Sequence, residues 1–268
     1  MKKTIDNLFP DLAKFYRRLR DKRIVSKRKF HATKLGFDFI GVESMPESRI
    51  ASGEVGLLQR YLAKADQFID VGANCGFYTL IACKAGVPVI CFEPNAENYN
   101  FILKNLYHNK FTAEAFQIAL SNKPAVLELF GGGEGASLVP NWGGMHNTYS
   151  QLVSVNTLDH LLSARFDKTC LFIKIDAEGH EFEILTGATK LLKQSLAPTW
   201  LIEHGLTENY DVGINPNFLQ LFEIFWQEGY QSFTACDKKL SVVRADVERW
   251  IANNCRDFGG INYLFIKA

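Results

Sequence analysis

A strand–turn–helix segment around residue 70 constrains the fold of this chain more than any other part of its sequence. Residues 68–71 form a short apolar run that includes Asp70 and is typical of a buried strand. Glycines at 72 and 76 enclose a tight turn, and the apolar residues 77–84 continue as a helix. A strand that passes through glycines into a helix is typical of a ligand-binding turn in an α/β sheet, because the free N–H groups at the helix start are hydrogen-bond donors.

The spacing of this turn indicates the kind of ligand. A dinucleotide-binding turn follows the pattern G-x-G-x-x-G, but position 74 of this chain is Asn. The carboxylate of Asp70 would repel a pyrophosphate and would suit the ammonium group of an amino-acid-like ligand, so the turn favours S-adenosylmethionine (SAM). Because glycine has no Cβ, Gly72 and Gly76 are expected to let the backbone approach this ligand closely. The candidate SAM-binding residues of the segment are Asp70, Gly72, Asn74, Gly76, Tyr78 and Thr79.

A second apolar strand ends in Glu93, which lies 23 residues after Asp70. An acid about 20 residues beyond a glycine turn, at the end of the next strand, is placed to accept hydrogen bonds from ribose hydroxyls. The alternative is that Glu93 is an acid favoured by the dipole of the following helix. Its spacing from Asp70 favours the contact with the ribose.

A third stretch, residues 171–181, carries the candidate catalytic groups. The two-residue period of a strand puts Lys174 and Asp176 on one face, with Asp176 at the carboxyl end. Ligands of open α/β sheets bind at these ends. A hydroxyl acceptor becomes a good nucleophile only when a base removes its proton. Asp176 is a candidate base by its placement and His180 by its usual pKa near neutrality. The role of Glu178, in the turn between them, is left open.

Another predicted strand, residues 199–203, ends at the same edge of the sheet and is followed by His204. We therefore expect Asp176, Glu203 and His204 to converge. Two carboxylates and an imidazole would suit a divalent cation that polarises the acceptor hydroxyl. They would equally suit a metal-free set of acid/base and substrate-binding groups, and this second alternative is favoured.

Predicted strands and helices alternate along the chain after residue 53, which is typical of α/β folds. The predicted strands cover 67–71, 87–92, 115–118, 125–130, 152–155, 170–175, 199–203, 230–235 and 262–267. The predicted helices cover 54–62, 76–85, 95–108, 156–163, 180–194, 216–228 and 245–253. A shorter strand or hairpin arm is expected at 37–42. The glycine-rich segment 131–150 is either a binding loop or a surface excursion.

The net charge of +1 is unevenly distributed, because residues 1–29 hold eleven Lys/Arg and three Asp. Apolar residues in this segment fall on one helical stripe, and a basic amphipathic helix can contact an anionic membrane surface. The alternative is a docked helix with a solvated basic face, which is favoured. The remaining chain is acidic and has no aromatic-basic groove pattern, so the sequence indicates against a nucleic-acid partner.

No apolar run approaches the length of a membrane span, and the six cysteines include no C-x-x-C pair. These features predict a cytoplasmic protein with reduced thiols. The chain length fits one large domain with an extension. We expect a basic helix and hairpin over 1–49 and a ligand-binding domain over 50–268. No motif specifies an oligomeric state.

Four motifs together resemble those of the FkbM family of SAM-dependent methyltransferases, over roughly residues 50–205. The resemblance implies a Rossmann-like class I methyltransferase fold. This α/β fold has a mostly parallel seven-stranded sheet in the order 3-2-1-4-5-7-6, with the last strand antiparallel and helices on both faces. The motifs are Asp70-Val-Gly-Ala-Asn-Cys-Gly-Phe-Tyr-Thr, Phe92-Glu-Pro-Asn, Ala119-Leu-Ser-Asn and Lys174-Ile-Asp-Ala-Glu-Gly-His-Glu.

The resemblance also implies SAM-dependent O-methylation of a hydroxyl on a sugar, a glycolipid or polysaccharide, or a secondary metabolite. Ala119 and Ser121 would border the adenine of SAM, and Phe77 or Tyr78 would contact its sulfonium group. The catalytic candidates remain Asp176, His180, Glu203 and His204. Residues 1–49 and 131–150 carry no family motif and are expected to select the acceptor.

Two other functions use similar sequence features. A nicotinamide-dependent oxidoreductase has a similar sheet, but the missing second glycine of G-x-G argues against it. A non-catalytic scaffold would bind SAM without transferring its methyl group.

Overall fold

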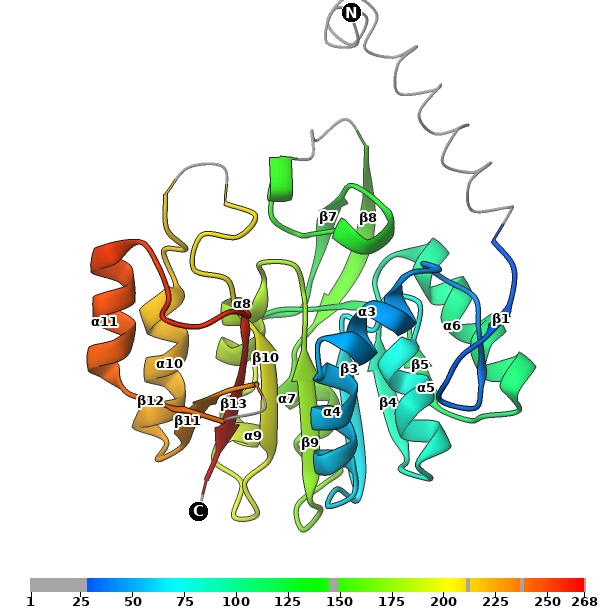
Figure 1. Cartoon of the computed structure of the whole chain (residues 1–268), viewed down its shortest axis with the longest axis horizontal. Coiled ribbons are helices and arrows are strands. Elements are labelled where there is room, and N and C mark those ends of the chain that lie inside the picture. The colour runs from blue at the N-terminus through cyan, green and yellow to red at the C-terminus, as the bar shows by residue number, and fades with distance from the viewer. Residues whose placement is uncertain (1–27, 145–148, 211–212, 237–238, 268) are drawn as a thin grey trace, which may run out of the picture.

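The computed structural model describes residues 28–144, 149–210, 213–236 and 239–267. An eight-stranded sheet forms the centre of the molecule (Figure 1). Its strands, from one edge to the other, are β12 (Ser241–Val242), β11 (Gln231–Thr234), β13 (Asn262–Ile266), β10 (Thr199–Glu203), β9 (Leu171–Ile175), β3 (Gln67–Val71), β4 (Val89–Phe92) and β5 (Glu114–Phe116).

The strand order confirms the fold implied by the resemblance. With β3, β4, β5, β9, β10, β11 and β13 taken as strands one to seven, the sheet has the order 3-2-1-4-5-7-6. β13 is antiparallel to both of its neighbours, whereas β3, β4, β5, β9 and β10 are parallel. The short strand β12 adds an eighth strand at the edge, which the sequence did not predict.

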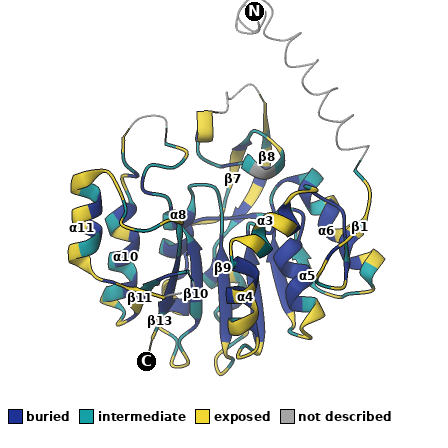
Figure 2. Ribbon diagram, viewed as in Figure 1, coloured by how far each residue is buried: buried dark blue, intermediate teal, exposed yellow. Residues whose placement is uncertain are grey.

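Helices cover both faces of the sheet and enclose two hydrophobic cores. All five residues of β3 and of β9 are buried, as expected for central parallel strands with helices on both sides (Figure 2). One core includes α4 (Glu54–Leu62), α5 (Phe77–Lys84) and α6 (Ala96–Asn109). The other includes α7 (Leu158–Leu162), α8 (Glu181–Thr186), α9 (Thr189–Leu192), α10 (Phe218–Gln227) and α11 (Arg244–Asn253).

The helix predicted over 180–194 is divided into α8 and α9. Gly187 ends α8, and a Cβ at this position would lie 2.2 Å from the backbone oxygen of Ser121. The backbone at Ser121 therefore leaves no room for a side chain at the position where α8 ends. Sequence periodicity alone gave no sign of this contact.

A smaller sheet rises beside the carboxyl ends of the central strands (Figure 1). It contains β6 (Ala119–Leu120), β8 (Ser150–Asn156) and β7 (Ala125–Phe130), in that order. Residues 119, 129, 153 and 155 form its small core. The glycine-rich segment connects β7 to β8 and includes two short 3-10 turns, η1 (Gly133–Gly135) and η2 (Trp142–Gly144).

The described part of the N-terminal extension is a hairpin followed by a helix. β1 (His31–Ala32) pairs with β2 (Asp38–Phe39), close to the expected hairpin arm, and α3 (Met45–Ala51) follows. The predicted basic helix falls almost wholly outside the described residues. The predicted domain boundary after residue 49 lies inside α3, and the division into two parts stays a prediction.

The buried side chain of Asn105, on α6, attaches this extension to the domain. Its amide exchanges hydrogen bonds of 2.9 Å with the backbone N–H and C=O of Ile40. It also donates to the backbone oxygen of Cys75, in the turn after β3, at 2.8 Å. The extension and the ligand-binding turn therefore share one buried anchor.

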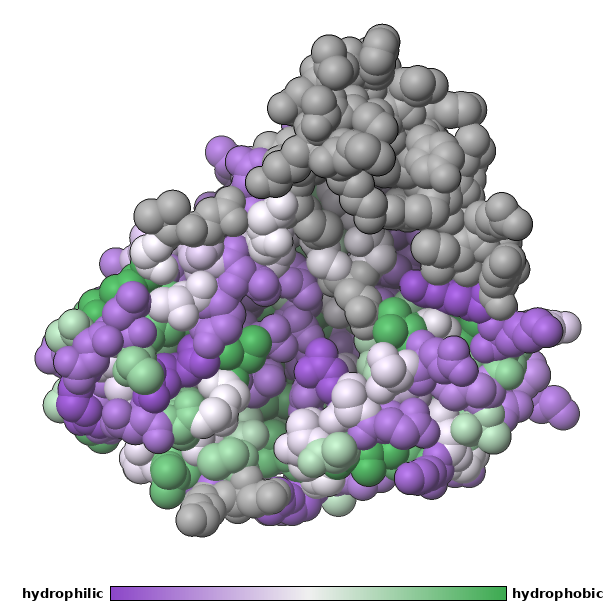
Figure 3. Space-filling view, turned by 45° about the horizontal axis from the view of Figure 1, so that its top comes forward, coloured by the Kyte–Doolittle hydropathy of each residue, from purple (hydrophilic) through white to green (hydrophobic). Residues whose placement is uncertain are grey.

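Within the described residues, no helix is both long and apolar enough to cross a bilayer. The face shown in Figure 3 is mainly hydrophilic, with hydrophobic residues in small, separate groups.

The turn after β3 lies directly against the end of β9. Gly72 has a φ of +77°, and a Cβ on it would lie 1.8 Å from the backbone oxygen of Asp176. Asp176 in turn donates its backbone N–H to the carbonyl oxygen of Val71 at 3.0 Å. Only glycine fits this position, because the protein's own backbone fills the space of a side chain.

Replacing Gly72 with alanine tests this contact. Gly86 also has a φ of +77°, but a Cβ there would meet no atom within 4 Å. Gly86→Ala is therefore the control: its loss of unfolding free energy, about 1–2 kcal/mol, reports only the cost of placing alanine in left-handed backbone. We expect Gly72→Ala to lower the free energy of unfolding by about 1–3 kcal/mol more, through overpacking, as measured by urea denaturation.

A Gly72→Ala protein that does not fold, beside a folded Gly86→Ala protein, would support the same account. Equal losses of stability in the two variants would contradict it, because the end of β9 would then accommodate the added methyl group freely.

Candidate functional site

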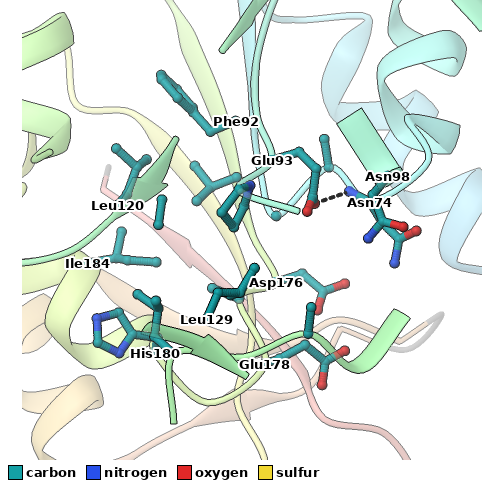
Figure 4. A pocket seen from close by; sticks show the side chains of 18 of the residues that line it. Asn74, Phe92, Glu93, Asn98, Leu120, Leu129, Asp176, Glu178, His180 and Ile184 are labelled. Atoms are coloured by element: carbon teal, nitrogen blue, oxygen red, sulfur yellow. Dashed lines mark hydrogen bonds between the residues drawn. The ribbon is translucent and has the colours of Figure 1, made fainter. Parts of the chain in front are cut away.

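A cavity of about 270 Å³ opens at the carboxyl ends of β3, β4 and β9. Its walls come from the turn after β3, the end of β4, residues 118–120, the glycine-rich segment, residues 176–184, and α3. Of the residues predicted from the sequence, those that line it are Gly72, Asn74, Phe77, Tyr78, Glu93, Ala119, Asp176 and His180. Figure 4 shows most of these side chains around the same space.

The turn after β3 has three residues with positive φ, namely Gly72, Asn74 and Gly76. The sequence predicted that the glycines admit a ligand, but their missing side chains make room for the protein itself. Asp176 lies against Gly72, and a Cβ at Gly76 would lie 3.2 Å from the side chain of Ile102 on α6. Gly72 and Asn74 still line the cavity, whereas Gly76 does not.

Glu93 lies where the sequence placed it, at the end of β4, and is 4% exposed. One carboxylate oxygen accepts from the backbone N–H of Asn74 at 2.8 Å, and the other from that of Asn95 at 2.8 Å (Figure 4). Burial raises the pKa of Glu93 to about 8, although these two hydrogen bonds lower it. Each oxygen keeps a second lone pair, so the carboxylate can still accept hydrogen bonds from a ligand.

Asp70 and Thr79 lie beneath the turn and do not line the cavity. The hydroxyl of Thr79 donates to Oδ2 of Asp70 at 2.7 Å. Oδ1 of Asp70 is buried and has no hydrogen-bond partner among the described residues. Burial raises the pKa of Asp70, and the nearby charge of Lys174 lowers it. The direct contact predicted between Asp70 and a ligand amine is therefore not supported by the shape of the cavity.

Lys174 and Asp176 form the buried ion pair of the site. Lys174 is 1% exposed, and its ammonium group donates to Oδ2 of Asp176 at 2.7 Å. It also lies 4.5 Å from the ring centroid of Tyr78. Burial alone would lower the pKa of Lys174, but Asp176, Glu54 and other carboxylates raise it, so the ammonium stays charged. This charge fixes the carboxylate of Asp176 at the cavity wall.

The pair continues into a chain of contacts that ends on α3. The hydroxyl of Tyr78 donates to one carboxylate oxygen of Glu54, on α4. The other oxygen accepts from Nη1 of Arg49 at 2.9 Å. Arg49 lines the cavity from α3, and the sequence gave no signal for it because it lies outside every recognised motif.

His180 lies at the apolar end of the cavity, near Leu120 and Ile184 and apart from Asp176 (Figure 4). Its Nε2 is 2.9 Å from Oγ of Ser121. Burial lowers the pKa of His180, while Glu183 raises it. The structure therefore separates the two predicted base candidates. Ser121 does not line the cavity itself, but its hydroxyl contacts His180, which does.

His204 lies in the aromatic core rather than at the cavity, which contradicts its predicted place among the catalytic groups. It is 2% exposed, and its ring stacks on Phe218 with centroids 5.2 Å apart. Burial lowers the pKa of His204 to about 4, so the ring is neutral. Asp176, Glu203 and His204 do not form a metal-binding cluster, and no other such cluster occurs in the described part of the chain.

Glu203 lines a second, smaller cavity beside the first, together with Glu178. Burial, followed by the charge of Asp176, raises the pKa of Glu203 well above its usual value, and Lys174 lowers it. Glu203 therefore lies near the Lys174–Asp176 pair without lining the main cavity.

Part of the glycine-rich segment lines the cavity, which supports its interpretation as a binding loop. Gly133, Ala136 and Leu138 line the cavity. Two side chains attach the segment to Glu178: Oγ of Ser137 donates to its backbone oxygen at 2.6 Å, and the indole N–H of Trp142 donates to its carboxylate at 2.7 Å.

Asn98, on α6, holds the other side of this segment. Its amide donates to the backbone oxygen of Gly133 at 2.9 Å, and its side chain also lines the cavity (Figure 4). Neither Asn98 nor Trp142 was predicted from the sequence, since each acts through a contact between segments far apart in the chain.

The methyltransferase FkbM domain family matches residues 70–232 of this chain, which is more than half of its length. A curated relative, the hexuronic acid methyltransferase AglP of Haloferax volcanii, is 26% identical over 163 residues. That alignment covers 59% of this chain and 65% of AglP, so it spans less than two thirds of the relative.

Two solved structures resemble this chain, each with a TM-score below 0.5. A SAM-dependent methyltransferase from Agrobacterium tumefaciens has a TM-score of 0.47 and 10% identity, over 90% of this chain and 70% of that one. A precorrin-6y C5,15-methyltransferase from Geobacter metallireducens GS-15 has a TM-score of 0.43 and 14% identity, over 80% of this chain and 87% of that one. The fold is established by the sheet order and the family match.

The buried carboxylate of Glu93 generates a prediction about pH. The pKa of Glu93 is about 8 in the ligand-free protein, and hydroxyl groups donate best to the ionised carboxylate. A diol-bearing ligand should therefore bind more tightly as the pH rises through this value. We expect Glu93→Gln to weaken binding of S-adenosylhomocysteine by about 10–100-fold at alkaline pH, as measured by calorimetry.

The rise in affinity for S-adenosylhomocysteine with pH should disappear in Glu93→Gln. It should persist in the control Glu97→Gln, which alters a neighbouring acid that does not line the cavity. An unchanged pH dependence in Glu93→Gln would contradict the assignment.

Proposed function

The chain belongs to the methyltransferase FkbM family, and we propose that it transfers a methyl group to a hydroxyl oxygen of a sugar. SAM is the methyl donor of this family. The observation that carries the proposal is the position of Asp176, whose carboxylate faces the cavity at the end of β9 and is held by the buried ammonium of Lys174.

The cavity has an apolar end and a polar end, which is what an amphipathic cofactor such as SAM requires. The apolar end, formed by residues such as Leu120 and Ile184, would receive the adenine. Glu93 would accept hydrogen bonds from the ribose, because its buried oxygens keep free lone pairs. The turn at Asn74 would face the methionine part. In this arrangement His180 borders the adenine and is not the base.

For O-methyl transfer, the protein must position the acceptor hydroxyl and accept its proton. Bound SAM supplies an electrophilic methyl group on sulfur. Asp176 would take the proton of the acceptor hydroxyl as the oxygen is methylated and S-adenosylhomocysteine is released. Lys174 holds the carboxylate in place, so little reorganisation is needed at that moment. Holding both reactants in line can lower the barrier by about 7–11 kcal/mol.

The proposal of a sugar acceptor rests on two supports. The relative AglP is named as a methyltransferase of hexuronic acid, which is a sugar. The segments that carry no family motif, α3 and the glycine-rich segment, form part of the cavity wall in this chain and are placed to select an acceptor. A peripheral membrane contact through residues 1–29 stays a prediction from sequence.

Asp176→Asn tests the proposed base. The amide keeps the size of the side chain but cannot take a proton from the acceptor, so we expect kcat to fall by about 10²–10⁴-fold. Binding of S-adenosylhomocysteine should change little, because the fold and the adenine end remain. The assay follows transfer of a labelled methyl group from SAM to a panel of hexuronate-containing oligosaccharides.

Asp167→Asn, on the exposed surface, is the matched control and should retain full activity. Full activity in Asp176→Asn would show that another group is the base. Labelled methyl on no hydroxyl acceptor, despite tight cofactor binding, would favour the non-catalytic alternative.

A further inference from the structure

Arg49 brings a guanidinium group into the wall of the cavity from outside the family match. It lies on α3, twenty-one residues before the matched range of 70–232 begins. Its side chain is 34% exposed, and it lines the cavity together with Met45 of the same helix. The family match therefore gives no information about this residue, and its role is argued from the structure alone.

Among the described residues, Arg49 has one hydrogen-bonding partner, the carboxylate of Glu54. Nη1 donates to Oε2 of Glu54 at 2.9 Å, and this is the one ion pair of Arg49 within the described residues. The second oxygen of Glu54 is taken by the hydroxyl of Tyr78. A guanidinium has five N–H donors in a planar fork, and two on one edge match the two oxygens of a carboxylate.

The charges around the cavity direct an anionic ligand group to this position. Among the described residues that line the cavity, Arg49 is the one lysine or arginine, whereas Glu93, Asp176 and Glu178 are acids. Lys174 is buried and already bonded to Asp176, so it does not offer a second cation. A ligand carboxylate would be repelled by Asp176 and attracted to Arg49 near α3.

We propose that Arg49 binds a ligand carboxylate at the polar end of the cavity. The inference rests on the proposed function, because methyl transfer to a sugar offers two sources of this group. One is the methionine carboxylate of SAM, and the other is a uronate carboxylate on the acceptor. Glu54 keeps the guanidinium in place before the ligand arrives, which reduces the entropy lost on binding.

Calorimetry on three variants tests the first source. The ligands are S-adenosylhomocysteine and its decarboxylated analogue, which differ only in the carboxylate. If Arg49 binds the methionine carboxylate, Arg49→Met should weaken binding of S-adenosylhomocysteine by about 10–100-fold and leave binding of the analogue unchanged. Arg49→Lys should show a smaller loss, since it keeps the charge but not the fork.

Glu54→Gln is the matched control for the ion pair. It weakens the support of Arg49 but keeps the guanidinium, so the preference for the carboxylated ligand should persist. Urea unfolding of each variant separates a loss of stability from a loss of binding.

The second source is tested on the complex with S-adenosylhomocysteine, using glucuronate and glucose as the probes. If Arg49 binds the acceptor carboxylate, the variants keep wild-type affinity for S-adenosylhomocysteine, and Arg49→Met loses a preference for glucuronate over glucose. Two affinity ratios are compared: S-adenosylhomocysteine over its decarboxylated analogue, and glucuronate over glucose. The inference is overturned if Arg49→Met changes neither ratio, or if it weakens the binding of S-adenosylhomocysteine and of its analogue equally.

Failure of the proposed function is a separate result. A protein that methylates no hydroxyl would still support the inference if Arg49→Met selectively weakens binding of the carboxylated cofactor product. A protein that methylates sugars at wild-type rates after Arg49→Met, with both binding ratios unchanged, would overturn the inference and leave the proposed function intact.

Discussion

The buried ammonium of Lys174 is the interaction on which the rest of the site depends. It donates a hydrogen bond to Asp176. The nearby carboxylates of Asp176, Glu54 and Asp70 raise the pKa of Lys174 and so keep it charged. Burying a carboxylate costs several kcal/mol unless a counter-charge and hydrogen bonds compensate. Without Lys174, Asp70 would lose a nearby positive charge that lowers its pKa, and Asp176 would lose the hydrogen bond that orients it. One cation therefore allows several acids to gather at the end of β9.

Close contacts between separate segments give this acidic site its shape. The missing side chain of Gly72 admits the backbone of Asp176, and Glu93 bonds to the backbone of Asn74, so β3, β4 and β9 meet within one turn. Trp142 then attaches the glycine-rich segment to Glu178. Most of the site, including the glycine-rich segment, lies within the family match, whereas α3 precedes that match and completes one wall.

The positions of Glu93 and Asp176 were predictable because strand periodicity determines which residues reach the carboxyl edge, whereas the sheet order followed from the resemblance to the FkbM family. His204 was misplaced because residues beyond a strand end no longer share its edge, and this ring entered the aromatic core. His180 follows a turn with positive φ at Glu178 and Gly179, which redirects the chain toward the apolar end. Arg49 depends on a packing contact of α3 that no local pattern encodes.

In the proposed reaction, a single cavity holds SAM with its reacting end beside the Lys174–Asp176 pair. A crystal structure of the protein with bound S-adenosylhomocysteine tests this most directly. The account predicts adenine against Leu120 and Ile184, ribose hydroxyls on Glu93, and the sulfur facing Asp176. Adenine bound near α3, or a sulfur atom at the apolar end beside His180, would contradict it.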